Sequence, residues 1–335
     1  MRFGALFLND VPPDQVVEHA VRAETAGFEY VWTADSHIIW QDPWPIYGVI
    51  AQATQRVKFG PLVTNPGSRH WTVTASMLAV LNQLSGGRAV CGIGRGDSAR
   101  RTLGLKPVTV REFEEAIIGI KGLVAGETVR IDNREHSLPW LEGNADGSEI
   151  WGAGYGPKVL DVVGRTCDGF VLQLADPEIL EWTWGMVKDA AEKAGRPRDQ
   201  VKAQILAPAY VSDDEERAHA QLRWFGGSVG NHVADLIKYH SAKEIPAVLT
   251  DFIENRPRYD YLKHDTIGNS ATEYVPNEIN RRFCIMGTVD DHIAKLRHLE
   301  SLGVDLVTVM FVHDDMAGTM AAYADEIMPA LRNPS

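Results

Sequence analysis

The sequence predicts an α/β fold in which eight parallel strands, alternating with helices, close into a barrel. One observation is a recurring joint, in which a helix ends at one or two glycines and an apolar run begins within a few residues. The other is the number of apolar runs of strand length, which is eight. Eight alternating units of this kind are typical of a TIM barrel. The joint occurs in Val21–Trp32, Leu81–Ile93, Val162–Leu174 and Leu299–Val312.

The predicted strands are spread over the whole chain. In order they are Arg2–Leu8, Tyr30–Thr33, Val57–Val63, Ala89–Ile93, Ile150–Ala153, Gly169–Leu174, Val201–Val211 and Leu306–Val312. Length alone would allow two domains, but barrels often exceed the average domain, so we expect a single (β/α)8 barrel domain over residues 1–335.

The segment between the seventh and eighth strands is too long for one helix. Ser212–Trp224 reads as a helix capped by Ser212, because an acidic residue follows three positions later. Glycine pairs come next, so we expect residues 225–275 or thereabouts to form an insertion over the barrel mouth. Smaller insertions are expected at Ile38–Ile46 and at Arg130–Ser148, the second as a small hairpin.

Composition argues against several classes of protein. The net charge of −12 is unsuited to binding nucleic acid, which requires clustered Lys and Arg. Met1–Leu8 is too short for a signal peptide, and no stretch approaches the length of a membrane span. Three widely separated cysteines indicate reduced thiols and no structural zinc. We therefore expect a cytoplasmic protein that acts on small molecules, with neither nucleic acid nor a membrane as partner.

Polar residues gather where the predicted strands end, at the edge of a barrel that carries active sites. Loops are polar in most proteins, so a single member of this set carries little weight. The ends are Asn9-Asp10, Ala34-Asp35-Ser36-His37, Thr64-Asn65, Arg95-Gly96-Asp97, Gly154-Tyr155-Gly156, Gln173-Leu174 and His313-Asp314-Asp315.

Asp97 follows a glycine-rich break after the fourth strand. Gly94 and Gly96 leave the backbone exposed there, although their spacing is only weak evidence for a nucleotide site. The carboxyl group has two interpretations. It caps the next helix or pairs with Arg100 or Arg101, or it handles a proton, in which case burial would raise its pKa toward neutrality.

A second loop, Gly154-Tyr155-Gly156, leads into Pro157, a favoured first residue of a helix. Its backbone N–H groups can face a phosphate at the helix N-terminus, or the loop is an ordinary helix start. Arg281 and Arg282 would add a charged contact to such a phosphate.

Several of these motifs, taken together, resemble the bacterial-luciferase-like superfamily of flavin- and deazaflavin-dependent oxidoreductases, which includes the methylenetetrahydromethanopterin-reductase-like proteins. The resemblance covers nearly the whole chain and implies a barrel with an insertion before the last strand. The motifs are Phe59–His70, Leu84–Arg88, Gly92–Asp97, Tyr30–Asp35, Ala153–Lys158, Asp168–Phe170 and Gly287–Asp291.

Within this superfamily the chain looks closer to enzymes that use coenzyme F-420, a deazaflavin hydride carrier, than to those that use FMN and oxygen. Sugar-phosphate dehydrogenases of the F-420 branch carry Asp-His-x-x-x-Trp after the second strand, and this chain has Asp35, Ser36 and Trp40 at those positions. The histidine falls one place later, as His37. Asp176 lies where that branch can offer a phosphate-binding Lys. The substrate class is therefore left open.

The resemblance also implies roles for individual residues. Asp97, His37 and Trp40 would be catalytic, with Trp44 beside them and Met310, His313 and Asp314 on the opposite wall. A cis peptide is expected between Leu62 and Val63, against the flavin ring. The residues implied to bind the cofactor are Asp35, Leu62, Val63, Thr64, Asn65, Gly94, Gly96, Gly154, Tyr155, Gly156 and Gln173.

The predicted function is hydride transfer between F-420 and a small organic substrate with a C=O, C=N or C=C bond or an electron-poor ring. The alternatives are an FMN-dependent two-component monooxygenase, a flavin-binding protein without turnover and a metal-dependent barrel hydrolase. We expect no metal, a homodimer by analogy with the superfamily, and a separate flavin or F-420 reductase as the source of reduced cofactor.

Overall fold

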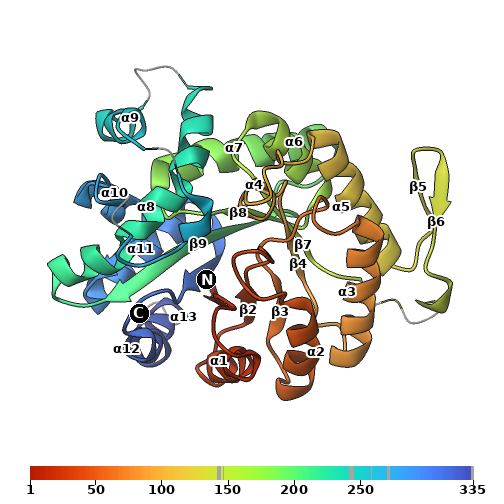
Figure 1. The fold of residues 1–335 in the computed structure, drawn as a ribbon, viewed down its shortest axis with the longest axis horizontal. Coiled ribbons are helices and arrows are strands. Elements are labelled where there is room, and N and C mark those ends of the chain that lie inside the picture. The colour runs from red at the N-terminus through yellow and green to blue at the C-terminus, as the bar shows by residue number, and fades with distance from the viewer. Residues whose placement is uncertain (142–144, 146, 241–244, 258, 270–271, 333–335) are drawn as a thin grey trace.

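The computed structural model of the protein describes residues 1–141, 145, 147–240, 245–257, 259–269 and 272–332 (Figure 1). Its centre is a ring of parallel strands, which confirms the predicted TIM barrel. Neighbouring strands follow the order β3-β2-β1-β11-β9-β8-β7-β4. Two isolated parallel bridges, Phe59 with Ala89 and Thr64 with Ile93, connect the β3 and β4 segments and nearly close the ring. The strands are β1 (Arg2–Phe7), β2 (Tyr30–Thr33), β3 (Lys58–Pro61), β4 (Cys91–Ile93), β7 (Ile150–Ala153), β8 (Gly169–Leu172), β9 (Lys202–Val211) and β11 (Val304–Met310).

Helices surround the ring, as the alternating pattern predicts. Each of the longer ones buries an apolar stripe against the strands and its neighbours. The helices are α1 (Pro13–Thr25), α2 (Trp44–Ala53), α3 (Trp71–Ser85), α4 (Ser98–Arg101), α5 (Val110–Val124), α6 (Pro157–Thr166), α7 (Pro177–Lys193), α8 (Glu215–Ile237), α9 (Ala247–Glu254), α10 (Asn277–Phe283), α11 (Val289–Ser301), α12 (Met316–Ala322) and α13 (Met328–Arg332).

The interior of the barrel is filled with side chains. The rings of Tyr30 and Trp32 are stacked with centroids 5.5 Å apart, and both are buried. Gly4 makes room for them, since a Cβ atom there would lie 2.5 Å from Thr308 Oγ1 and 3.1 Å from Trp32 Nε1. Buried Gln204 donates its side-chain N–H to Thr308 Oγ1 at 2.7 Å. The barrel is thus a packed core whose open space lies at its ends.

The hairpin expected within Arg130–Ser148 is present as β5 (Val129–Ile131) and β6 (Arg134–His136), which extends from the right of the molecule in Figure 1. Another short strand, β10 (Ile285–Gly287), pairs with the end of β9. It was not predicted, because three residues give too little periodicity to recognise a strand.

The predicted end of the helix after the seventh strand is wrong. Asp214, not Ser212, accepts the capping hydrogen bond, and α8 continues through the glycines to Ile237. Gly226 and Gly227 pack closely here, because Cβ atoms would lie 2.5 Å from a Val275 methyl carbon and 2.7 Å from a Thr272 methyl carbon. These glycines therefore admit a neighbouring segment instead of ending the helix.

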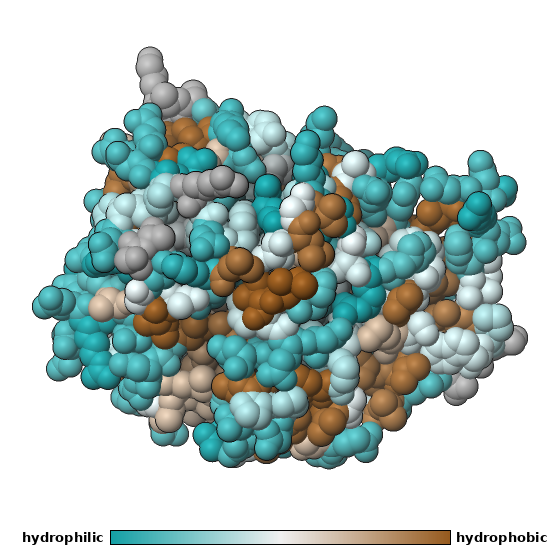
Figure 2. Space-filling model, viewed as in Figure 1, coloured by the Kyte–Doolittle hydropathy of each residue, from teal (hydrophilic) through white to brown (hydrophobic). Residues whose placement is uncertain are grey.

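The surface is mostly hydrophilic on the face shown in Figure 2, with hydrophobic residues gathered in separate patches. Among the described residues, no helix combines the length and the apolar character that crossing a membrane requires.

Candidate active site

A cavity of about 660 Å³ lies at the C-terminal ends of the barrel strands. It is bordered by the loops after β2, β3, β4, β7 and β8 and is covered in part by α8 and by residues 264–265. The residues predicted for the site that line it are Asp35, Trp40, Leu62, Val63, Thr64, Asn65, Gly94, Gly96, Asp97, Gly154, Tyr155, Gly156 and Gln173.

Asp35 is buried at the cavity wall, and one of its carboxylate oxygens accepts three hydrogen bonds. Oδ2 accepts hydrogen bonds from Trp44 Nε1 at 3.0 Å, Thr64 Oγ1 at 2.7 Å and Arg69 Nη1 at 3.0 Å. Oδ1 is buried and has no partner in the described part of the chain. Because an unpaired carboxylate oxygen is costly to bury, Oδ1 is a ready acceptor for a ligand N–H or O–H.

The loop after β3 crosses the floor of the cavity. The peptide bond between Leu62 and Val63 is cis, which confirms that prediction. Asn65 Oδ1 accepts the backbone N–H groups of Gly67 and Ser68 at 3.1 and 2.8 Å. Its carbonyl oxygen is therefore committed to the turn, which leaves the amide N–H₂ as the group that can reach a ligand.

The Gly154-Tyr155-Gly156 loop places the start of α6 at the cavity. No side chain caps this helix. Pro157 has no N–H and the Val159 N–H donates to the Gly156 carbonyl oxygen at 2.9 Å, so the N–H groups left for an anion are those of the loop and of Lys158. A Cβ atom on Gly154 would lie 2.3 Å from a Val159 methyl carbon, so the loop requires glycine there. The partly buried Tyr155 ring is stacked on His232, with centroids 4.7 Å apart and planes 3° apart.

Asp97, in the loop after β4, lines the same cavity. Its side chain forms an ion pair with Arg101, and Oδ2 accepts the Tyr261 hydroxyl at 2.9 Å and lies 3.7 Å from His232 Nε2. Burial alone would raise the pKa of this carboxyl group, but His232, Arg101 and Tyr261 lower it below its usual value. The expectation of a raised pKa is therefore wrong, and the pairing with Arg101 is confirmed. Asp97 precedes α4 but makes no side-chain capping hydrogen bond.

The chain matches the model of the luciferase-like monooxygenase family over residues 1–306. It belongs to this family. The 5,10-methylenetetrahydromethanopterin reductase of Methanolobus tindarius is 30% identical over 319 residues, which cover 91% of this chain and 92% of that protein. The F-420-dependent glucose-6-phosphate dehydrogenase of Microbacterium testaceum is 25% identical, with 96% of this chain and 94% of the relative covered.

Solved structures share the fold. The coenzyme F-420-dependent tetrahydromethanopterin reductase from Methanopyrus kandleri superposes with a TM-score of 0.77 at 22% identity, over 98% of both chains. The family-model match and the Methanolobus tindarius relative confirm the predicted resemblance to the superfamily.

His37, which was predicted to be catalytic, does not line the cavity of this luciferase-like chain. Its side chain is exposed, whereas Ser36 and Trp40 on either side line the cavity. Ser36 Oγ shares a hydrogen bond with Ser98 Oγ at 2.7 Å, so the loop bends with Ser36 turned inward. The prediction that His37 contacts the substrate is therefore wrong.

Arg281 and Arg282 are also absent from the residues that line the cavity. Arg282 Nε donates to buried Asp176 Oδ2 at 2.6 Å, and Arg281 pairs with Glu215. These arginines hold α10 in place, and the expected contact with a phosphate is not supported.

The far wall expected from the eighth strand is present only in part. Met310 lines the cavity. Asp314 is instead paired with Arg217 at 2.9 Å, and His313 is packed against Tyr210 outside the cavity. Among the described residues, no group of three or more His, Cys, Asp or Glu side chains could hold a metal ion.

Several residues that line the cavity were not predicted, because they come from α8 and the segment after α9. His232 and Asp235 lie three positions apart on α8, and Tyr239 follows the end of this helix. His264 is tilted against Trp40 with ring centroids 5.7 Å apart, and Asp265 Oδ1 is buried without a hydrogen-bond partner in the described residues. A continuous helix through Gly226 would have revealed the first group, whereas the sequence carries no comparable signal for the second.

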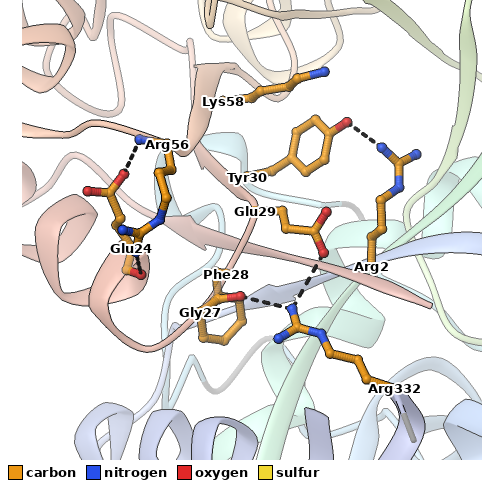
Figure 3. Close-up of a pocket in the computed structure, with 9 residues that line it drawn as sticks. All are labelled: Arg2, Glu24, Gly27, Phe28, Glu29, Tyr30, Arg56, Lys58 and Arg332. Carbon is orange, nitrogen blue, oxygen red and sulfur yellow. Dashed lines mark hydrogen bonds and ion pairs between the residues drawn. The ribbon is translucent and has the colours of Figure 1, made fainter. Parts of the chain in front are cut away.

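A second pocket, of about 430 Å³, lies at the N-terminal ends of β1, β2 and β3 (Figure 3). Its polar side chains contact one another: Arg2 donates to the Tyr30 hydroxyl at 2.7 Å, and Arg332 forms an ion pair with Glu29. Such a network at this end of a barrel is typical of residues that stabilise the fold.

Proposed function

We propose that the protein is an oxidoreductase that transfers hydride between coenzyme F-420 and a small organic substrate bearing a C=O, C=N or C=C bond or an electron-poor ring. The observation that carries this proposal is the pairing of two binding features in one cavity. A buried carboxylate oxygen of Asp35 without a partner suits a heterocycle with N–H donors, and the open start of α6 suits a phosphate.

The residues present fit a deazaflavin. Asp35 Oδ1 and the Gln173 amide would bind the pyrimidine edge of the ring system, and Thr64 and Asn65 would contact its other side. The Gly154-Tyr155-Gly156 loop would hold the phosphate. Position 154 requires glycine, because a Cβ atom there would clash with Val159. Among the basic residues that line the cavity, Arg101, Lys106 and Lys238 would attract an acidic tail.

When bound, F-420 supplies the hydride and a ring that reacts little with oxygen. The chain's own part is to hold the substrate carbon close to the hydride-bearing carbon and to move a proton beside it. Trp40, buried against His264, supplies a flat apolar wall on which a substrate can lie. Asp97 stays ionised near neutral pH, because its pKa is lowered, and it would stabilise positive charge next to the reaction.

The choice of F-420 over FMN is supported by the names of the relatives, which include F-420-dependent dehydrogenases. The runner-up is an FMN-dependent monooxygenase supplied by a separate reductase, which the name of the family favours.

Equilibrium titration of the purified protein with F-420 and FMN, each oxidised and reduced, tests the proposal. We expect tighter binding of F-420, with an affinity that falls as salt is raised, because its acidic tail meets the basic residues. A panel of ketones, imines, activated alkenes and nitroaromatics, followed by the absorbance of F-420, then reports turnover. Tight FMN binding with weak F-420 binding would support the monooxygenase, and F-420 binding without turnover would support a binding protein.

The proposal includes a homodimer in the cytoplasm that receives reduced cofactor from a separate reductase. Exposed apolar side chains at helical spacing on α3 support self-association: Val73, Val80 and Leu84 are 47%, 42% and 48% exposed. Sedimentation of the purified protein tests this part.

A further inference from the structure

We propose that His232 is the residue that exchanges a proton with the substrate, and that Asp97 acts as its positioning residue. This inference rests on the proposed function, because it assigns the proton that accompanies hydride transfer. It begins with the geometry of α8, which brings one imidazole into the cavity between two loops of the barrel.

The position of the His232 ring is determined on two sides. One face is stacked on Tyr155, with planes 3° apart, and Nε2 lies 3.7 Å from Asp97 Oδ2. Asp97 is held in turn by Arg101 and by the Tyr261 hydroxyl at 2.9 Å. A carboxylate held beside an imidazole fixes its orientation and stabilises its protonated form.

One ring nitrogen of His232 remains available to a ligand. Within the described residues Nδ1 makes no hydrogen bond, whereas both nitrogens of His264, the other imidazole at the cavity, face protein groups. His264 Nδ1 lies 2.7 Å from the Tyr259 hydroxyl, and Nε2 lies 3.6 Å from Asp265 Oδ1. His232 is therefore the better placed of the two to contact a substrate.

The step balances without a further reactant. In reduction of a carbonyl, the electron pair of the C–H bond of reduced deazaflavin forms the new C–H bond of the substrate. The C=O π pair moves to oxygen, which takes the proton from protonated His232 and leaves the imidazole neutral. In the reverse direction neutral His232 removes the hydroxyl proton as hydride leaves the carbon.

Charged and titratable groups surround His232 from four parts of the chain. Burial lowers the pKa of its imidazole, and Asp97 opposes that effect. The groups are Asp97 and Arg101 after β4, Tyr155 after β7, Asp235 on α8 itself, and Tyr261 and His264 after α9.

The pair can be tested without a substrate. NMR of protein with labelled histidine, assigned with His232→Gln, gives the pKa of the His232 imidazole. Asp97→Asn keeps the size of the side chain and removes its charge, so we expect this pKa to fall by about one unit. Asp189→Asn, on the exposed surface of α7, should leave it unchanged. An unchanged His232 pKa in Asp97→Asn would overturn the pairing.

Turnover tests the catalytic role. With reduced F-420 and the panel acceptor that the wild type reduces fastest, we expect His232→Gln to lower kcat by about 100-fold or more while Kd for F-420 changes less than about threefold. His298→Gln, on the exposed surface of α11, is the matched control and should retain wild-type kcat.

Asp97→Asn should shift the pH profile of kcat to lower pH by the amount seen in NMR, an effect that a purely structural role would not produce. Near-normal kcat in His232→Gln would overturn the inference. If His232→Gln does not fold, the shift of the kcat pH profile in Asp97→Asn tests the inference instead. If the protein does not bind F-420 at all, the proposed function fails, while the NMR result still decides whether Asp97 and His232 are coupled.

Discussion

Asp35→Asn separates a binding role of this carboxylate from a structural one. The asparagine oxygen can occupy the position of Oδ2 and keep the hydrogen bonds from Trp44, Thr64 and Arg69. The amide N–H₂ then replaces Oδ1, so that the unpaired acceptor at the cavity becomes a donor. A hydrogen bond to a charged group contributes about 1.5–3 kcal/mol, and about 1.4 kcal/mol corresponds to a tenfold change in Kd. We therefore expect F-420 to bind about 10- to 100-fold more weakly.

Fluorescence titration with F-420 measures this loss, and thermal unfolding checks that the variant is folded. Asp42→Asn is the matched control, because Asp42 binds the same Arg69 at 2.7 Å but is 45% exposed and does not line the cavity. It should keep Kd within about twofold, as expected for an exposed ion pair. If Asp35→Asn folds normally and binds F-420 as tightly as the wild type, Asp35 only anchors the loop and the reasoning from its unpaired oxygen is wrong.

Three further predictions concern stability and assembly. Gly60→Ala should lower the free energy of unfolding in urea by about 2 kcal/mol or more, because its Cβ would lie 1.9 Å from the Val90 carbonyl oxygen, whereas Gly48→Ala, in open space on α2, should be neutral or stabilising. His292 has a pKa lowered to about 4, mainly by burial, so the free energy of unfolding should be highest above pH 6.5 and fall by up to about 3 kcal/mol as pH drops toward 4, and His292→Gln should flatten that dependence. Val80→Glu should convert the proposed dimer to a monomer in sedimentation, and an unchanged dimer would place the interface elsewhere.

The barrel and much of its site could be predicted because the relevant signals are local. Asp35, Thr64 and Gly154 each follow an apolar run within a few residues, and the parallel topology brings such ends together whatever the intervening sequence. His37 shows the limit of this logic. Its neighbour Ser36 faces inward and His37 does not, a difference that depends on one turn of backbone and leaves no mark on composition or spacing.

The roof of the cavity could not be predicted, because its signals conflict with local rules. Gly226 and Gly227 are ordinarily breakers of a helix, yet here they lie inside α8 and admit the segment around Thr272 and Val275. If the helix is taken to end at Trp224, the residues of the next three turns are not placed over the barrel mouth.

Asp97 shows how a residue can be found from sequence while its chemistry is not. A carboxylate after a glycine loop in a barrel is a reasonable acid–base candidate, and burial alone would have raised its pKa. The outcome depends on Arg101, which is local, and on His232 and Tyr261, which lie more than a hundred positions away in the sequence. Because those distant groups favour the ionised form, Asp97 is a poor proton donor and a good partner for a cation. A proton in this cavity is then better carried by the imidazole beside Asp97 than by Asp97 itself.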